Sequence, residues 1–211
     1  MVDAPSITYL IEGDETILVD TSYGDPERMS ELHYECRREP DETMAGALAL
    51  HDYEPADIDT VVLTHLHWDH CYNLELFEDA ELLVQRRELE YAIAPYNVHA
   101  IPYESKAIGR TPPWLEHDLT AIEGEVEISP GVTVFPTPGH TIGHMSVEVQ
   151  DGDETVVAAA DAIPTFENLE GTETSEYIAS YSMNTLDWWR SANEIDERAD
   201  RILPGHEFDI L

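Results

Sequence analysis

The amino-acid sequence predicts an α/β fold arranged as a four-layer αββα sandwich, in which two sheets pack face to face between outer helices. The chain has two β-rich halves, and each is followed by a segment with helical periodicity. Histidines and aspartates gather just after several of the strands, where α/β folds usually form their sites. A length of 211 residues is enough to bury one substantial core, so we expect a single domain over residues 1–211.

The first half predicts a sheet with its own helices. Gly13 lies in a short turn that would join the first two strands as a hairpin. Asp41 is placed to cap a helix in which Met44, Ala47 and Leu48 recur at helical spacing. We expect strands over residues 7–11, 16–20, 58–64 and 80–85, and a second helix over residues 88–93.

The second half predicts another sheet with one long helix. Asn184 can cap a helix that places Leu186, Trp189, Ala192 and Ile195 on one face. Neither periodicity is sustained between residues 95 and 119 or between residues 164 and 183, so both segments are expected to be irregular. We expect strands over residues 132–136, 145–149, 155–160 and 201–203.

The charge of the chain is strongly acidic. Ten basic residues face 45 acidic ones, which gives a formal net charge of −35, and Lys106 is the sole lysine. Such self-repulsion is tolerated where salt screens it, so we interpret the protein as halophilic, with an ordinary acidic enzyme as the alternative. Nucleic acid is not an expected partner, because binding to phosphates relies on clustered Lys and Arg.

The cysteines and the N-terminal residues indicate the compartment. Cys36 and Cys71 are too few for a disulfide framework, which is typical of reducing conditions. Residues 1–13 lack a basic region followed by an apolar run, so no signal peptide is expected. Apolar runs are too short to span a bilayer. We therefore expect a soluble, cytoplasmic protein without a membrane partner.

A histidine-rich turn follows the strand predicted over residues 58–64. Residues 64–70 read Thr-His-Leu-His-Trp-Asp-His. On extended backbone alternate side chains face the same way, so His65 and His67 can reach one metal ion while the apolar Leu66 and Trp68 face the core. Asp69 and His70 can serve a neighbouring ion where the chain bends away. Nitrogen and carboxylate donors of this kind suit Zn²⁺, and they also accept iron, manganese or cobalt.

Three more potential ligands follow apolar runs. His140 and His206 each come directly after a Pro-Gly pair, and Asp161 ends a run of alanines. Any one of them alone would be read as a turn residue or a satisfied polar group. Together with the turn at residues 64–70 they indicate a metal site, because so dense a cluster has few structural uses.

These motifs resemble those of the metallo-β-lactamase superfamily over nearly the whole chain. Within it, residues 84–91 and 137–144 look most like N-acyl homoserine lactone lactonases, although Pro164 stands where those enzymes carry a tyrosine. The resemblance implies two metal ions, the first held by His65, His67 and His140, the second by Asp69, His70 and His206, with Asp161 bridging both.

The implied activity is hydrolysis of a lactone or a similar ester. Two divalent ions beside Asp69 and Asp161 would stabilise a bridging hydroxide near neutral pH, which would attack the carbonyl carbon. Asp69 or Asp161 would then pass the proton to the leaving group, and these are the expected catalytic residues. Alternatives are an iron-dependent sulfur dioxygenase of the same fold, a thioesterase-like hydrolase, and a relative that binds without catalysis. The oligomeric state stays open, a homodimer included.

The remaining histidines have other expected roles. By the resemblance His144 is not a ligand, and we interpret it as a residue that orients the loop carrying His140. Four further histidines lack a comparable context and are interpreted as ordinary surface or loop residues: His33, His51, His99 and His117. Cys71 is interpreted as a small packing residue.

The net charge of −35 leads to a test in salt. The melting temperature and the activity should both rise from dilute buffer into the molar range, because salt screens the repulsion between carboxylates. Circular dichroism melts at stepped KCl concentrations measure the first quantity. A melting temperature that does not change with salt would contradict the halophilic interpretation.

Overall fold

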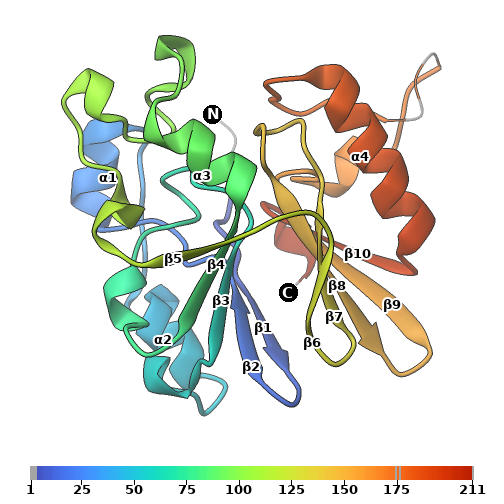
Figure 1. Cartoon of the computed structure of the whole chain (residues 1–211), viewed down its shortest axis with the longest axis horizontal. Coiled ribbons are helices and arrows are strands. Elements are labelled where there is room, and N and C mark those ends of the chain that lie inside the picture. The colour runs from blue at the N-terminus through green and yellow to red at the C-terminus, as the bar shows by residue number, and fades with distance from the viewer. Residues whose placement is uncertain (1–3, 174, 176, 211) are drawn as a thin grey trace.

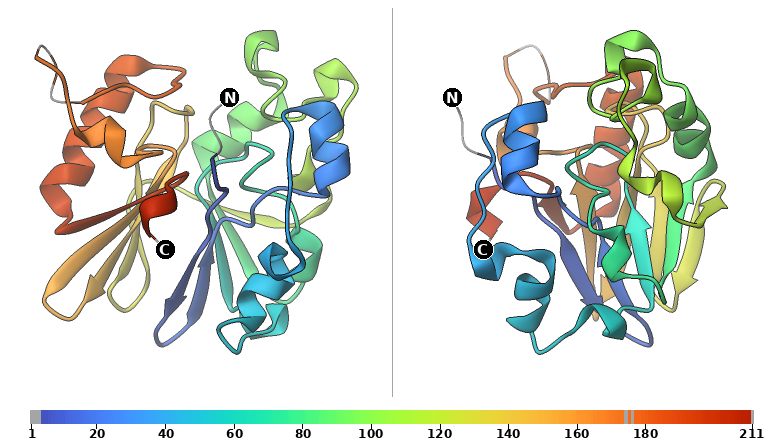
Figure 2. Two further views of the ribbon diagram at one scale, coloured as in Figure 1. Left: turned by 180° about the vertical axis from the view of Figure 1, so that it is seen from behind. Right: turned by 90° about the vertical axis from the view of Figure 1, so that its left-hand side faces the viewer.

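The chain folds into two β-sheets that pack against each other, with helices on the outer side of each sheet (Figure 1). This computed structural model describes residues 4–173, 175 and 177–210. The layers follow the order helix, sheet, sheet, helix when viewed along the sheets (Figures 1 and 2). The predicted αββα sandwich is therefore confirmed.

The first sheet has the strand order β1-β2-β3-β4-β5, with β1 antiparallel to β2 and all other neighbours parallel. Helices α1 (Pro26–Leu32), α2 (Met44–Ala49) and α3 (Arg86–Ile93) lie on its outer side (Figure 1). The strands are β1 (Tyr9–Glu12), β2 (Thr16–Val19), β3 (Thr60–Leu63), β4 (Glu81–Gln85) and β5 (Leu119–Ile122).

The second sheet has the order β10-β9-β8-β7-β6, with β10 parallel to β9 and the other neighbours antiparallel. Helix α4 (Thr185–Arg198) covers its outer side (Figure 1). The strands are β6 (Val126–Ser129), β7 (Val132–Pro136), β8 (Met145–Asp151), β9 (Glu154–Ala160) and β10 (Arg201–Pro204).

Three hydrophobic clusters separate the four layers. In β3, Val61 and Leu63 join the cluster under the outer helices, while Val62 joins the cluster between the sheets. In β7, Val134 packs between the sheets and Phe135 faces α4. Alternate side chains of a strand point to opposite faces, so one strand contributes to two clusters. Because both faces of these strands are buried, the functional loops lie at their ends.

Four of these loops meet at one end of the sandwich. They follow β3, β7, β9 and β10, which all run toward that end (Figure 2). A backbone hydrogen bond of 3.0 Å from the N–H of Met145 to the carbonyl of Thr64 ties the second sheet to the first there. The residues predicted to form the site are therefore brought together by the topology.

Helix α4 is rotated from its predicted orientation. Ala192 and Ile195 are buried as expected, but Leu186 and Trp189 are 56% and 42% exposed, and Trp188 takes the inner position. The indole N–H of Trp188 donates to the carbonyl of Ala162 at 2.7 Å. The predicted face was therefore wrong in two of its four residues.

A close contact explains this rotation. Gly139 has φ +140°, and a Cβ there would lie 2.3 Å from the Cα of Trp188. The hydroxyl of Ser191 also donates to the carbonyl of Pro138 at 2.7 Å. The helix thus packs its Trp188 side directly against the loop that carries His140.

Several local predictions also need correction. Thr43 caps α2 by accepting from the N–H of Gly46, and Asp41 lies in a preceding 3-10 turn instead. Helix α1 was not predicted, although Asp25 caps it and Pro26 occupies its first position. Strands β5 and β6 were not predicted either.

None of the helices in the described part of the chain has the length and apolar character to cross a bilayer.

Candidate metal centre

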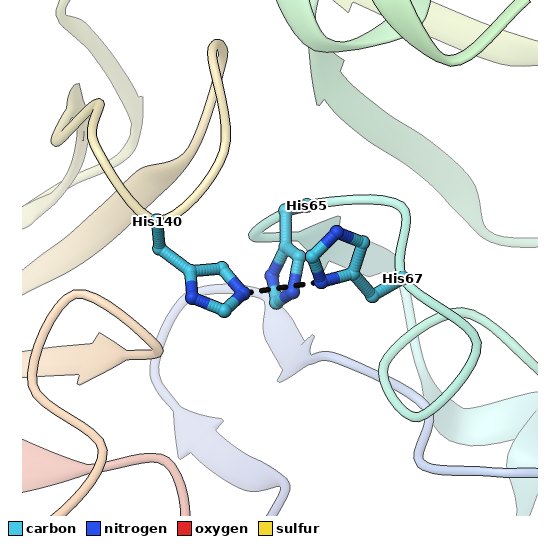
Figure 3. A group of neighbouring side chains, drawn as sticks. All are labelled: His65, His67 and His140. Atoms are coloured by element: carbon cyan, nitrogen blue, oxygen red, sulfur yellow. Dashed lines mark hydrogen bonds between the residues drawn. The ribbon is translucent and has the colours of Figure 1, made fainter. Parts of the chain in front are cut away.

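Three histidines from two sheets form the first group of potential ligands. His65 and His67 follow β3, and His140 comes from the loop between β7 and β8. Their rings point toward one another (Figure 3), with ligand atoms all within 4.8 Å. Nδ1 of His67 lies 3.1 Å from Nε2 of His140. The three residues are 0 to 5% exposed, so their side chains face each other away from bulk solvent.

A second group lies beside the first, and one carboxylate contacts both. The ligand atoms of Asp69, His70 and His206 also lie within 4.8 Å of one another. Asp161 Oδ2 is 3.1 Å from Nε2 of His140. Its Oδ1 is 2.9 Å from Nε2 of His206 and 3.3 Å from Nε2 of His70. The structure therefore brings all seven predicted residues together, with Asp161 between the two groups.

Backbone carbonyls set the orientation of two of these rings. Nδ1 of His140 lies 3.0 Å from the carbonyl of Tyr181, and Nδ1 of His206 lies 2.6 Å from that of Pro5. A carbonyl accepts from a protonated Nδ1, which leaves the lone pair of Nε2 free to bind a metal ion. Segments distant in sequence thus aim both Nε2 atoms into the site.

Asp20 is a buried partner of the site that the sequence did not reveal. It follows β2 with φ +61° and is 2% exposed. Its Oδ2 lies 2.7 Å from Nδ1 of His70 and accepts from the hydroxyl of Thr64 at 2.8 Å. Its Oδ1 accepts from the N–H of Thr64. Asp20 thereby holds both the His70 ring and the start of the histidine-rich turn. The sequence did not reveal this role, because a single aspartate after a strand forms no recognisable motif.

The unpaired atoms of the cluster test whether it fits a metal. Nε2 of His65, Nε2 of His70 and Oδ1 of Asp161 are buried without an aligned hydrogen bond, and these three residues form one group of potential ligands. Buried polar atoms are nearly always hydrogen-bonded, so three exceptions in one group require an explanation. Nitrogen and carboxylate donors that converge with free lone pairs are the arrangement that divalent transition metals need. The residues therefore fit a metal centre.

The pKa values differ across the cluster. Burial, followed by repulsion from neighbouring imidazoles, lowers the pKa of His65 and His67 well below the ordinary value, so both rings are neutral. Burial also acts to lower the pKa of His206, but the Asp161 carboxylate outweighs it and raises that pKa to about 9. Burial would raise the pKa of Asp161, yet the surrounding imidazoles hold it well below its usual range. Asp161 is therefore an ionised carboxylate between imidazoles.

His144 and Cys71 lie beside the site in supporting positions. The Nδ1 atom of His144 is 2.9 Å from the hydroxyl of Thr137, whose N–H donates to the carbonyl of His144. These contacts close the loop that carries His140. The thiol of Cys71 donates to the carbonyl of His67 at 3.1 Å. Both residues are fully buried.

His33 lies in the loop after α1, as predicted, but it is not an ordinary exposed residue. Its ring stacks on Trp68 with centroids 4.0 Å apart, and its side chain is 2% exposed. Nε2 of His33 lies 2.8 Å from Glu104, which also accepts from the hydroxyl of Tyr72 and faces Arg110. Local sequence could not predict this burial, because Glu104 lies 71 residues from His33 along the chain. The hydrogen bonds of Glu104 thus fix the His33 ring against Trp68, the residue between His67 and Asp69.

The fold and the cluster together define a class, the metal-dependent hydrolases with an αββα sandwich. The chain belongs to the metallo-β-lactamase superfamily, whose family model matches residues 2–206. Both the expected family and the expected enzyme class are thereby confirmed. The chain is 31% identical over 181 residues to an N-acyl homoserine lactonase from a Bacillus species, an alignment that covers 81% of this chain and 68% of the relative.

Other relatives agree with this assignment. A probable metallo-hydrolase of Mycobacterium tuberculosis is 30% identical over 214 residues, covering 93% of this chain and 68% of the relative. Among solved structures, an N-acyl homoserine lactone hydrolase with N-hexanoyl-L-homoserine bound at its catalytic metal centre superposes with a TM-score of 0.74. It is 23% identical and covers 98% of this chain and 83% of that one, which supports the fold.

The contact between Asp20 and His70 leads to a prediction about protonation. Asp20→Asn removes a negative charge 2.7 Å from Nδ1 of His70, so the pKa of His70 should fall in metal-free protein. Zinc affinity should fall about 10-fold to 100-fold, as is typical when a ligand loses its orienting partner. NMR titration of the imidazole signals and chelator competition measure these effects. Asp14→Asn, at an exposed turn, is the control; an unchanged His70 pKa in Asp20→Asn would contradict the assignment.

Proposed function

We propose that this metallo-hydrolase opens a lactone or a similar ester bond, with N-acyl homoserine lactones as the substrate class. The observation that carries the proposal is the convergence of two groups of potential ligands on Asp161, in a chain about 30% identical to N-acyl homoserine lactonases. We also propose that the protein works in a salt-rich cytoplasm, which its acidic composition supports.

The proposed ligand assignment divides the cluster into two sites. His65, His67 and His140 would hold one ion, and Asp69, His70 and His206 the other. Asp161, whose two oxygens face different groups, would bridge them. Zn²⁺ is the proposed ion at both positions, because imidazole and carboxylate donors dominate. Two divalent ions, when bound, lower the pKa of coordinated water and polarise a carbonyl group.

Two carboxylates are the proposed catalytic residues. Either Asp161 or Asp69 would pass the proton of the attacking water to the leaving group. The Asp161 side chain is 9% exposed and lies among the imidazoles of the cluster. The Asp69 side chain is 24% exposed and lies nearer solvent. It is therefore better placed to pass that proton on to a leaving alkoxide.

The metal content and the ligand assignment are tested together. Purified protein should contain about two zinc ions per chain, and His65→Ala, His140→Ala and Asp161→Ala should each abolish lactone hydrolysis. His117→Ala, outside the cluster, should keep normal metal content and activity. Elemental analysis and a screen of lactones, thioesters and phosphodiesters in molar salt provide the measurements. A single iron per chain without hydrolysis would support a sulfur dioxygenase instead.

The position of Pro164 raises a second question about the lactone carbonyl. Proline has no side-chain donor, and the carbonyl of Pro164 accepts from the backbone N–H of His206 at 2.8 Å. Tyr181 is the tyrosine whose ring lies edge-on to His140, with centroids 5.8 Å apart. Three other tyrosines already donate to carboxylates, in the pairs Tyr72–Glu104, Tyr103–Glu88 and Tyr177–Asp196.

We propose that the metal ions alone polarise the substrate carbonyl in this chain. Tyr181→Phe should then change the catalytic rate on a good lactone by less than about threefold, because no oxyanion donor is lost. Tyr96→Phe, on an exposed side chain, is the matched control. The rates are compared at saturating metal in molar salt. A drop of about 100-fold for Tyr181→Phe with metal content intact would show that Tyr181 donates to the carbonyl.

A further inference from the structure

Glu88 is a fully buried carboxylate that contacts the loops on both sides of the first ligand group. It lies in the first turn of α3 and is 0% exposed. Its Oε1 accepts from the N–H of Leu66 at 3.1 Å and from the hydroxyl of Tyr103 at 2.8 Å. Its Oε2 accepts from the hydroxyl of Thr141 at 2.8 Å and from the N–H of Gly143 at 3.0 Å.

Three of these four donors come from the loops that would hold the ligands, and the fourth is Tyr103. Leu66 stands between His65 and His67, in the loop of the first sheet. Thr141 directly follows His140, in the loop of the second sheet. Each carboxylate oxygen thus accepts one hydrogen bond from a backbone N–H of a ligand loop and one from a hydroxyl group. A single side chain spans the two loops.

Two further contacts show how closely this part of the molecule is fitted around Glu88. A Cβ at residue 143 would lie 2.1 Å from the backbone nitrogen of Glu88, so only glycine allows this approach. The Tyr103 ring meets His67 edge-on, with centroids 4.7 Å apart. The hydrogen bond from Tyr103 to Glu88 therefore also fixes the surface against which His67 packs.

We propose that Glu88 is a positioning residue that sets the distance between the His65–His67 loop and the His140 loop, and thereby the geometry of the first metal site. The proposal rests on the ligand assignment made above. Three ligands supplied by two sheets have no common backbone element, so their relative placement depends on cross-links between the loops. Glu88 supplies such a link with both of its oxygens.

Glu88→Gln separates the positioning role from simple space filling. Glutamine has nearly the same shape, but one end becomes an NH₂ group that can only donate. The hydroxyls of Tyr103 and Thr141 can rotate to accept, whereas the N–H groups of Leu66 and Gly143 cannot. Whichever way the amide is turned, one ligand loop loses its backbone hydrogen bond.

The experiment measures zinc affinity by chelator competition and the visible absorption bands of the Co²⁺-loaded protein. Glu88→Gln should bind zinc about 10-fold to 100-fold more weakly and show altered cobalt bands, since orienting partners of ligands have effects of this size. Glu90→Gln removes the same charge from an exposed position on α3 and should match the unmodified chain. Circular dichroism confirms that the compared variants are folded.

The possible outcomes separate the two proposals. Normal zinc affinity and an unchanged cobalt spectrum in folded Glu88→Gln would overturn the role of Glu88 and leave the proposed function standing. If Glu88→Gln does not fold, Thr141→Val removes one donor to Oε2 and decides the matter: about tenfold weaker zinc binding supports the role, and normal binding overturns it. An unmodified chain that binds neither zinc nor cobalt would refute the proposed function itself, and the role of Glu88 with it.

Discussion

The contacts of one buried carboxylate connect the parts of this protein that matter for its chemistry. Asp161 lies within 3.3 Å of three imidazoles, which belong to His70, His140 and His206. A buried ion without partners is costly, so this charge requires that the three loops carrying those rings meet. The loops come from both sheets, and the face-to-face packing of the sheets is therefore tied to the cluster.

The hydrophobic layers place the cluster at the strand ends. Val62 packs between the sheets while its neighbours Val61 and Leu63 pack under the helices, which leaves no room for a ligand within β3. The first potential ligand, His65, comes two residues after that strand ends. Polar chemistry and hydrophobic packing thus occupy different parts of the same chain segments, and neither disrupts the other.

Three buried acidic residues support the site in different ways. Asp20 faces the imidazole of His70, Glu104 is balanced by His33 and Arg110, and Glu88 is met by neutral donors alone. Each carboxylate uses both oxygens, as burial demands. In a chain with 45 acidic residues, these few are distinguished by their partners and not by their residue type.

The sequence by itself determined the fold class and gathered the seven residues that the structure brings together. The fold class depends on local periodicity, such as the alternation along strands. The seven residues were found from the two-residue step from His65 to His67, from positions that directly follow apolar runs, and from the resemblance of these motifs to a known superfamily. Only the tertiary structure decided which side of α4 packs inward, because Trp188 and Trp189 are adjacent and equally apolar, and a contact with Gly139 selects between them. It also revealed Asp20 and the contacts of Glu88. Glu88 belongs to the motif of residues 84–91, but the partners of these two carboxylates lie 15 to 55 residues away, and no local pattern records them.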